Sequence, residues 1–214
     1  MVPVIFLVFL SGCKERDSRM EQEELAKTFT TTSYNYTPYE LDLISFKEFS
    51  LPFNIDDAPS GGSVRVDTAS EMKLDNGEKI RYSSSNCCFM WSSPIDKPLR
   101  IRVVWKVIHN ASYHDGEAGA EYDMRSSRKS APGSRWCQAV VDVAPYTGPD
   151  RPKMLFLHFL PDGSVQAQLG TFLSAKPFSA EQVKLHSTPL AVGQICRQEI
   201  ENPFYGLPRT PHRE

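Results

Sequence analysis

The sequence predicts a mainly β fold: an antiparallel β-sandwich-like single domain with few short helices, stapled by disulfides. Three observations support this prediction. Short apolar segments alternate with turn sequences, helical signals are sparse, and several cysteines follow an apolar N-terminal leader. Residues 33–208 contain no repeat and no break in composition, so we expect one domain there, followed by a C-terminal tail at 209–214.

The composition is that of an ordinary globular protein. Hydrophobic residues make up 40% of the 214-residue chain and charged residues 23%. This balance excludes a disordered or collagenous chain and a multi-span membrane protein. Lys and Arg total 24 against 26 Asp and Glu, which gives a net charge of −2. A nearly neutral chain has no electrostatic footprint for nucleic acid, so we expect no nucleic-acid partner.

The N-terminus carries a predicted lipoprotein signal. Residues 2–10 are apolar, but this run is shorter than the about 20 residues that a membrane-spanning helix needs. Leu10-Ser11-Gly12-Cys13 then matches the bacterial lipobox, in which the cysteine thiol receives a diacylglycerol. We therefore expect a signal peptide at 1–12 and lipidation of Cys13.

Two features qualify this interpretation of the leader. No positive charge precedes the apolar run, and the alternative is a buried N-terminal strand with a chance cysteine. Lys14 stands where an aspartate would indicate inner-membrane retention, so the likeness to lipoprotein signals implies the periplasmic face of the outer membrane. Residues 14–32 are charged and lack Pro and Gly, so residues 13–32 are expected to be the lipidated cysteine and a polar tether.

Four further cysteines predict two disulfides, because an even number in an exported chain is typical of a disulfide framework. They are Cys87, Cys88, Cys137 and Cys196. A bond between the two adjacent cysteines would need a strained ring. We therefore expect the 87–88 segment to be tied to both distant cysteines, in either combination. Zinc binding is less favoured, because adjacent cysteines lack the usual ligand spacing.

The first half of the domain shows short strand patterns. Residues 41–53 and 63–66 carry alternating and continuous apolar positions interrupted by Pro and Gly. Asp75-Asn76-Gly77 is a tight-turn signal that predicts a hairpin leading into 78–82.

The clearest strand is 99–108. Its alternation predicts a core face and a solvent face. The core face comprises Leu99, Ile101, Val103, Trp105 and Val107, and the solvent face Arg100, Arg102 and Lys106.

The second half contains a further strand, a hairpin and a helix start. Residues 138–144 have a strand pattern, and 154–160 and 164–170 flank a Pro-Asp-Gly turn that predicts a hairpin. Ser179 and Gln182 resemble a capping box that opens one or two helical turns.

A polar stretch at 109–136 separates two strong strands, and a connection this long is usually functional or disordered. A mobile solvated loop and a partner-binding loop are both consistent with it. In the binding interpretation, aromatic and Met side chains act as anchors and flanking charges set specificity. The candidate contact residues are Tyr113, His114, Asp115, Glu117, Glu121, Tyr122, Met124, Arg125, Arg128 and Trp136.

No established catalytic motif occurs in the chain. There is no Gly-x-Ser-x-Gly elbow, P-loop, Gly-x-Gly-x-x-Gly turn or His-Glu-x-x-His sequence. His109, His114, Asp115 and Glu117 cluster in the polar stretch, but their spacing fits no defined site. His158 lies in an apolar strand and is expected to be a hydrogen-bonded core or half-buried histidine. We therefore expect no catalytic residue, cofactor or metal, which favours a binding function.

Several segments in this order resemble one family of bacterial lipoproteins of unknown function, often encoded beside type VI secretion phospholipase effectors. The segments are Ser33-Tyr-Asn-Tyr-Thr37, Asn86-Cys-Cys-Phe89, Arg102-Val-Val-Trp105, Val141-Asp-Val-Ala-Pro-Tyr146 and Leu157-His-Phe-Leu-Pro-Asp-Gly-Ser-Val165. Members so placed are taken to be periplasmic immunity proteins. The resemblance therefore implies a non-enzymatic, membrane-anchored protein that neutralises a cognate lipase toxin.

Two other function classes remain open. A structural or assembly lipoprotein of the cell envelope, with no toxin partner, would share the anchor, tether and disulfides. A small periplasmic hydrolase using His114 or His158 is the third possibility.

Overall fold

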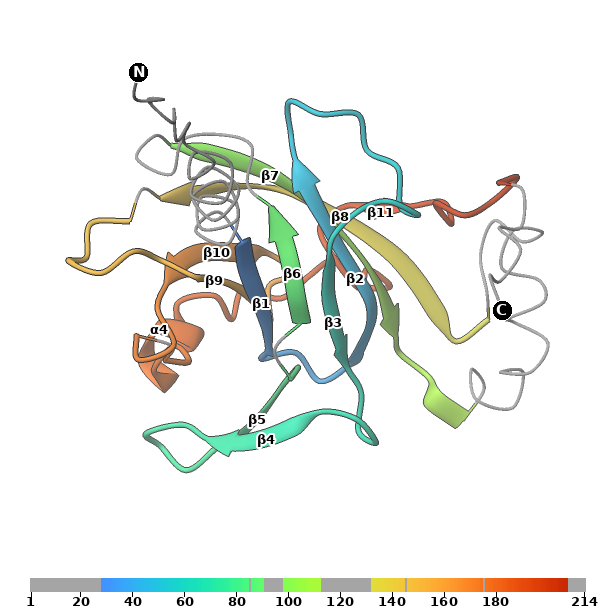
Figure 1. Ribbon diagram of the computed structural model, residues 1–214. Coiled ribbons are helices and arrows are strands. Elements are labelled where there is room, and N and C mark those ends of the chain that lie inside the picture. Colours follow the sequence, from blue (N-terminus) through green and yellow to red (C-terminus); the bar gives the residue numbers. More distant parts are fainter. Residues whose placement is uncertain are drawn as a thin grey trace, which may run out of the picture.

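A computed structural model describes residues 28–84, 86–90, 98–112, 132–144, 146–174 and 176–207 (Figure 1). Its eleven strands form one sheet with the order β3-β2-β7-β8-β10-β9-β1-β5-β4, while β6 pairs with β1 and β11 with β8. The fold is mainly β, as the sequence predicts. The elements are β1 (Thr28–Asn35), β2 (Glu40–Glu48), β3 (Ser60–Val64), β4 (Ser70–Lys73), β5 (Lys79–Tyr82), β6 (Asn86–Met90), β7 (Leu99–Ile108), β8 (Ser134–Ala144), β9 (Met154–Phe159), β10 (Val165–Gly170), helix α4 (Ala180–Lys184) and β11 (Glu199–Ile200).

Most expected strands and turns occur near where the local patterns placed them, although the pattern at 41–53 forms a strand only to Glu48 and that at 63–66 forms β3 at Ser60–Val64. β7 spans the predicted segment 99–108, and the turn with Gly77 at φ +84° joins β4 to β5. The Pro-Asp-Gly turn joins β9 to β10, with Gly163 at φ +71°. β1 begins at Thr28, five residues before the expected domain start at 33. No helix in the described part of the chain is long and apolar enough to cross a membrane.

The expectation of a wholly antiparallel sheet was wrong at two pairs. β1 runs parallel to β9, and β10 runs parallel to β8. Both parallel pairs arise because the β9–β10 hairpin inserts between β8 and β1 with β10, rather than β9, beside β8. The chain order of the strands does not determine this placement.

The sheet curves until β3 contacts β1, so its wall is nearly closed and barrel-like (Figure 1). The Ser33 hydroxyl on β1 donates a hydrogen bond of 2.8 Å to the Gly61 carbonyl oxygen on β3. Gly61 permits this approach, because a Cβ there would lie 2.5 Å from Cγ2 of Ile44.

The main hydrophobic core lies on the concave side of this curved sheet. Ile101, Val103, Trp105 and Val107 of β7 are buried there, which confirms the predicted core face. A second cluster covers the other side of β9 and β1, where Phe156 packs below Phe178 and Val183. The β9 strand is therefore buried on both of its faces.

The predicted solvent face of β7 is only partly exposed. Arg100 is exposed and pairs with Asp142 at 2.7 Å, but Lys106 is buried and its Nζ lies 3.3 Å from Oδ2 of Asp42. Val104, on the same face as Lys106, packs with Phe204 of the C-terminal segment. The alternation in β7 could not reveal this cover, because it comes from residues about a hundred positions away.

The buried carboxylate of Asp42 is stabilised by its neighbours. Burial alone would raise the pKa of Asp42, but the Lys106 ammonium, the Ser63 hydroxyl and the Leu43 amide together hold it below its ordinary value. The Ser63 hydroxyl donates to Asp42 Oδ1 at 2.6 Å, which links β3 to β2. The Asp42 carboxylate and the Lys106 ammonium are therefore buried together, so that neither charge is buried alone.

The expected disulfide pairing was wrong. Cys137 bonds to Cys196, with their Cα atoms 6.3 Å apart. The reason is that the C-terminal segment returns to β8, where β11 pairs Glu199 with Cys137. Cys87 is also disulfide-bonded, and the side chain of Cys88 lies outside the described residues.

Removal of the Cys137–Cys196 bond should destabilise the domain. The bond joins positions 59 residues apart. A loop of this size predicts a loss of about 4 kcal/mol in the free energy of unfolding for Cys137→Ala/Cys196→Ala. Urea unfolding of the double variant and the wild type measures this difference. A loss below about 1 kcal/mol would contradict an unfolded-state constraint of this size.

Candidate functional site

A groove of about 660 Å³ with mixed polar and apolar lining lies between β8, β10 and the α4 segment. In the described part of the chain, β8 and β10 pair through Val143 with Ala167 and Ala144 with Gln168, and residues 140–142 of β8 and 165–168 of β10 line the groove. We call it the glutamine groove. Its polar lining comprises Asp142, His158, Gln166, Gln168, Gln182 and His186.

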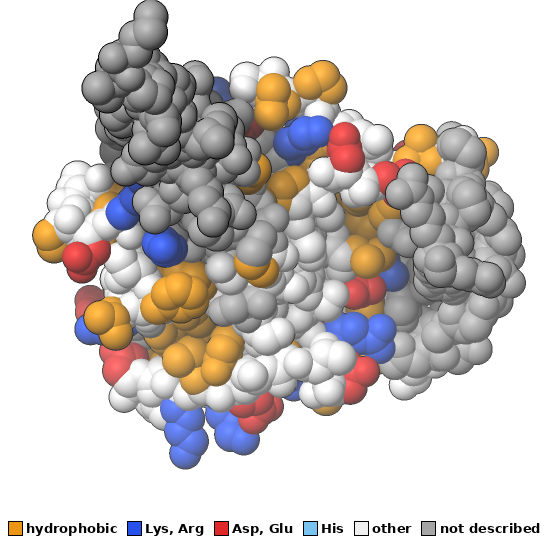
Figure 2. All heavy atoms as spheres, viewed as in Figure 1, with side chains coloured by type: hydrophobic (Ala, Val, Ile, Leu, Met, Phe, Trp, Pro, Cys, Tyr) orange, Lys and Arg blue, Asp and Glu red, His pale blue; other side chains and the backbone are white. Residues whose placement is uncertain are grey.

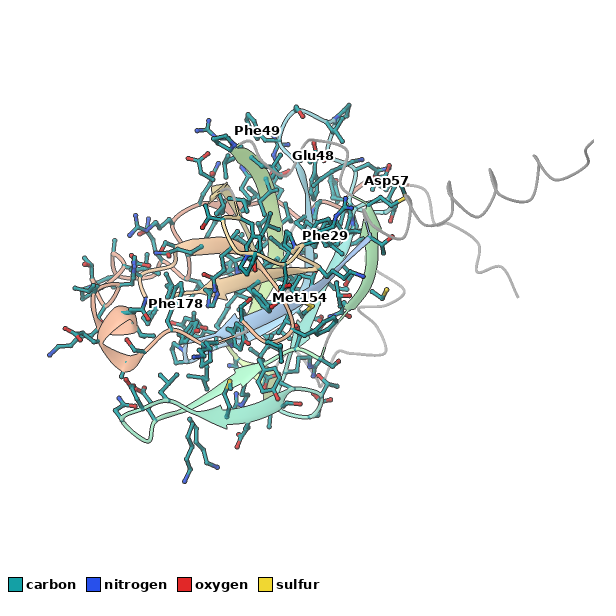
Figure 3. All side chains as sticks on the ribbon, turned by 60° about the vertical axis from the view of Figure 1, so that its left-hand side comes forward. Phe29, Glu48, Phe49, Asp57, Met154 and Phe178 are labelled. Carbon is teal, nitrogen blue, oxygen red and sulfur yellow. A yellow bond between two sulfur atoms is a disulfide. The ribbon has the colours of Figure 1, made fainter. Side chains whose placement is uncertain are left out.

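His158 lies on the inner wall of this groove and is fully buried. The ring of Phe178, which precedes helix α4 and is labelled in Figure 3, stacks on the imidazole with 3.9 Å between ring centroids. His158 Nδ1 lies 3.0 Å from the Tyr36 hydroxyl, and Nε2 lies 3.1 Å from the Gln168 side-chain amide. The sequence-based expectation of a hydrogen-bonded buried histidine is therefore confirmed.

The hydrogen bonds around Tyr36 indicate which imidazole nitrogen carries the proton. The Phe178 backbone N–H donates to the Tyr36 oxygen at 2.8 Å, so the Tyr36 proton is available to His158 Nδ1. Nε2 then carries the ring proton when the Gln168 amide, whose nitrogen occupies the 3.1 Å contact, is flipped to present its oxygen as the acceptor. A neutral imidazole satisfies both ring nitrogens in this arrangement.

Burial sets the protonation state of the His158 imidazole and of the Tyr36 phenol. It lowers the pKa of His158 from 6.5 to about 3. Burial also raises the pKa of Tyr36, and the hydrogen bond from Phe178 only partly offsets this effect. Both groups are neutral over the physiological pH range, which suits a structural network better than proton transfer.

A second network of hydrogen bonds and ion pairs lies at the margin of the groove. His186 Nε2 lies 2.9 Å from the Gln166 amide nitrogen, and His186 Nδ1 lies 3.6 Å from Asp162 Oδ2. Asp162 is buried, accepts from the Ser164 N–H at 3.0 Å and pairs with Arg197. Burial would raise the pKa of Asp162, but the hydrogen bonds of Ser164 and the Arg197 charge hold it below its ordinary value. This network thus joins the β9–β10 turn to the C-terminal segment.

Comparison with known families finds one family model that matches the chain. Residues 55–167, which are 113 of the 214 residues, match the family model DUF3304, described as a protein of unknown function. The chain belongs to the DUF3304 family. The family region contains His158, Asp162 and Gln166 and ends one residue before Gln168, so the α4 side of the groove lies outside it. No curated protein and no solved structure matches the chain.

Most residues named from the polar stretch lie outside the described residues. These are Tyr113, His114, Asp115, Glu117, Glu121, Tyr122, Met124, Arg125 and Arg128, and the lipidation candidate Cys13 does so as well. The stretch leaves the sheet after His109 and returns at Gly133, where the His109 N–H donates to the Gly133 carbonyl at 2.9 Å.

Trp136 differs from the other candidate contact residues because its position is described. It is 6% exposed and packs edge-on against Phe204, with ring centroids 5.7 Å apart. The proposed role as an exposed anchor is therefore wrong for Trp136, because the C-terminal segment covers its ring. In this structure it belongs to the same outer cluster as Val104.

Sequence analysis missed the glutamine groove. The alternation of Gln166 and Gln168 with apolar residues is typical of one polar face of a strand, but it does not reveal His186 opposite that face. The described residues contain no group of three or more His, Cys, Asp or Glu side chains placed to hold a metal ion.

His158 should make stability depend on pH. Its folded pKa of about 3 lies below the unfolded value, so the unfolded chain binds the extra proton as the pH falls from 6.5. Below about pH 6, wild-type stability should fall about 1.4 kcal/mol per pH unit more steeply than that of His158→Gln. Urea unfolding at a series of pH values measures both slopes. Equal slopes would show that His158 is not held neutral by the fold.

Proposed function

We propose that this chain is a membrane-anchored, non-enzymatic immunity protein that binds and neutralises a cognate type VI secretion phospholipase effector. The lipobox ending at Cys13 supports attachment at the periplasmic face of the outer membrane. The resemblance of five segments to lipoproteins encoded beside such effectors supports the identity of the partner. Membership of DUF3304 is compatible with this role and adds no activity of its own.

The observation that carries the binding role is the state of the titratable groups in the glutamine groove. Each of them has a partner: His158 has Tyr36 and Gln168, His186 has Gln166, and Asp142 has Arg100. A general acid or base needs a pKa near the working pH, and burial holds the pKa of His158 at about 3. The groove instead presents fixed amides, which favour recognition over proton transfer.

Apolar side chains at the margins of the groove add a hydrophobic component to this surface. Leu185 is 78% exposed and Val140 is 47% exposed, and both line the groove. Exposed apolar side chains beside preorganised polar groups are typical of a protein-binding surface. We propose the glutamine groove as a contact surface in addition to the 109–136 stretch.

An anchored inhibitor suits a toxin that attacks membranes. Attachment of inhibitor and toxin to one surface raises their effective concentration without any new contact. Binding that covers the entrance of the lipase site, or prevents its opening, then suffices for protection.

Affinity isolation tests the function directly. Acylated full-length protein, isolated from a cell that carries the neighbouring secretion genes, should recover a lipase in a stoichiometric complex that lacks lipase activity. Mass spectrometry identifies the partner. Recovery of envelope components alone would overturn the immunity proposal and favour the structural-lipoprotein alternative.

Two variants separate the candidate contact surfaces. Deletion of residues 112–131 should leave a folded protein that no longer protects cells, because His109 and Gly133 already meet. Leu185→Asp should weaken lipase binding at least about tenfold by burying a charge in the contact. Val192→Asp is the matched control, because Val192 is fully exposed and does not line the groove. Full protection by either test variant would remove that surface from the proposal.

A further inference from the structure

One end of the sheet gathers exposed apolar side chains. The pairings of Thr28 with Met90 and of Met154 with Gly170 place the start of β1, the end of β6 and the open end of the β9–β10 hairpin together. The end of β2 and the start of β7 lie at the same end, because Glu48 pairs with Ile101 and the β7–β8 register continues to Leu99.

Five large apolar side chains at this end are exposed, and we call them the apolar rim. Their exposed fractions are 42% for Phe49, 42% for Leu51, 60% for Met90, 63% for Phe172 and 92% for Leu173. Figure 2 shows hydrophobic side chains on the upper margin of the molecule, over the β2–β3 loop. At the opposite end, Val66 follows β3 and is 61% exposed.

Cationic side chains accompany the apolar rim. Arg151, Lys153 and Lys176 are exposed and flank β9 and the turn that carries Phe172. The Arg102 guanidinium carbon lies 5.3 Å from the Phe49 ring centroid, so that ring also has a cation beside it. Asp150, directly before Arg151, is the acidic residue among the described residues 146–153 that precede β9. Aromatic and aliphatic groups with adjacent Lys and Arg are the chemistry that enters the headgroup region of an anionic bilayer.

The N-terminal segment reaches the structure at this same end. β1 begins at Thr28, 15 residues after Cys13. Fifteen residues span at most about 50 Å, so an acylated Cys13 would attach the bilayer to this end of the sheet and keep it within that reach. A surface held in place by an anchor needs little affinity of its own to make contact.

We propose that the apolar rim docks on the lipid surface and fixes the orientation of the domain on the membrane. This inference rests on the proposed acyl anchor and extends it, because an anchor on a polar tether would by itself leave the domain free to rotate. The proposed contact is between the apolar rim and anionic phospholipid headgroups, with Phe172 and Leu173 inserted and Lys153 and Lys176 at the phosphate level.

A fluorescent probe on the full-length acylated protein tests the orientation. Dansylalanine replaces Leu173 in one protein and Val66 in another, since both side chains are exposed and lie at opposite ends. Each protein is reconstituted on phosphatidylethanolamine–phosphatidylglycerol vesicles, and floated material is collected. The probe at 173 should show a blue shift and several-fold stronger quenching by doxyl-labelled lipid than the probe at 66.

The outcomes distinguish docking by the apolar rim from attachment by the acyl anchor. Protein that floats with equal quenching at both positions overturns the membrane-docking rim alone, whereas protein that does not float overturns the anchor and the rim together. Lys153→Glu/Lys176→Glu should reduce the quenching at 173, while Lys73→Glu/Lys184→Glu, which changes exposed lysines away from the rim, should not. Equal quenching in the two double variants would overturn the role of the rim lysines.

Discussion

Burial of β9 on both faces is the constraint on which the rest of the structure depends. Leu155 and Leu157 point into the concave core, so the curved sheet must close around them. Phe156 and His158 point outward, and an outer layer must therefore cover them. Phe178 provides that layer, and its backbone N–H orients the Tyr36 hydroxyl toward the imidazole. The inner core, the outer layer and the inner wall of the glutamine groove thus follow from one strand.

Local sequence patterns predicted several of the elements but not what covers them, and they missed β1 and β11. The alternation in β7 and the turn at Gly163 depend on residues within a few positions, and both were correct. The burial of Lys106 and Trp136, and the Cys137–Cys196 bond, depend on the C-terminal segment returning to β8. These are long-range contacts, which periodicity and turn signals do not encode.

In the candidate site, too, local patterns were informative and long-range contacts were not. His158 was placed in the core from its apolar neighbours, but its partner Tyr36 lies 122 positions away and could not be inferred. The residues named from the polar stretch were chosen for their chemistry, and the one whose position is described, Trp136, has become part of the core. Chemistry alone therefore identifies candidates for recognition, whereas exposure separates contact residues from buried ones.

The place of the C-terminal segment has a consequence for the order of events during biosynthesis. Phe204 and Ile200 cover the outer face of β7 and β8, so these central strands keep an uncovered apolar surface until the residues after β11 have been made. The outer cluster therefore cannot form on the segment up to β8 alone. Return of the C-terminal segment to β8 acts as a latch that completes this side of the sheet.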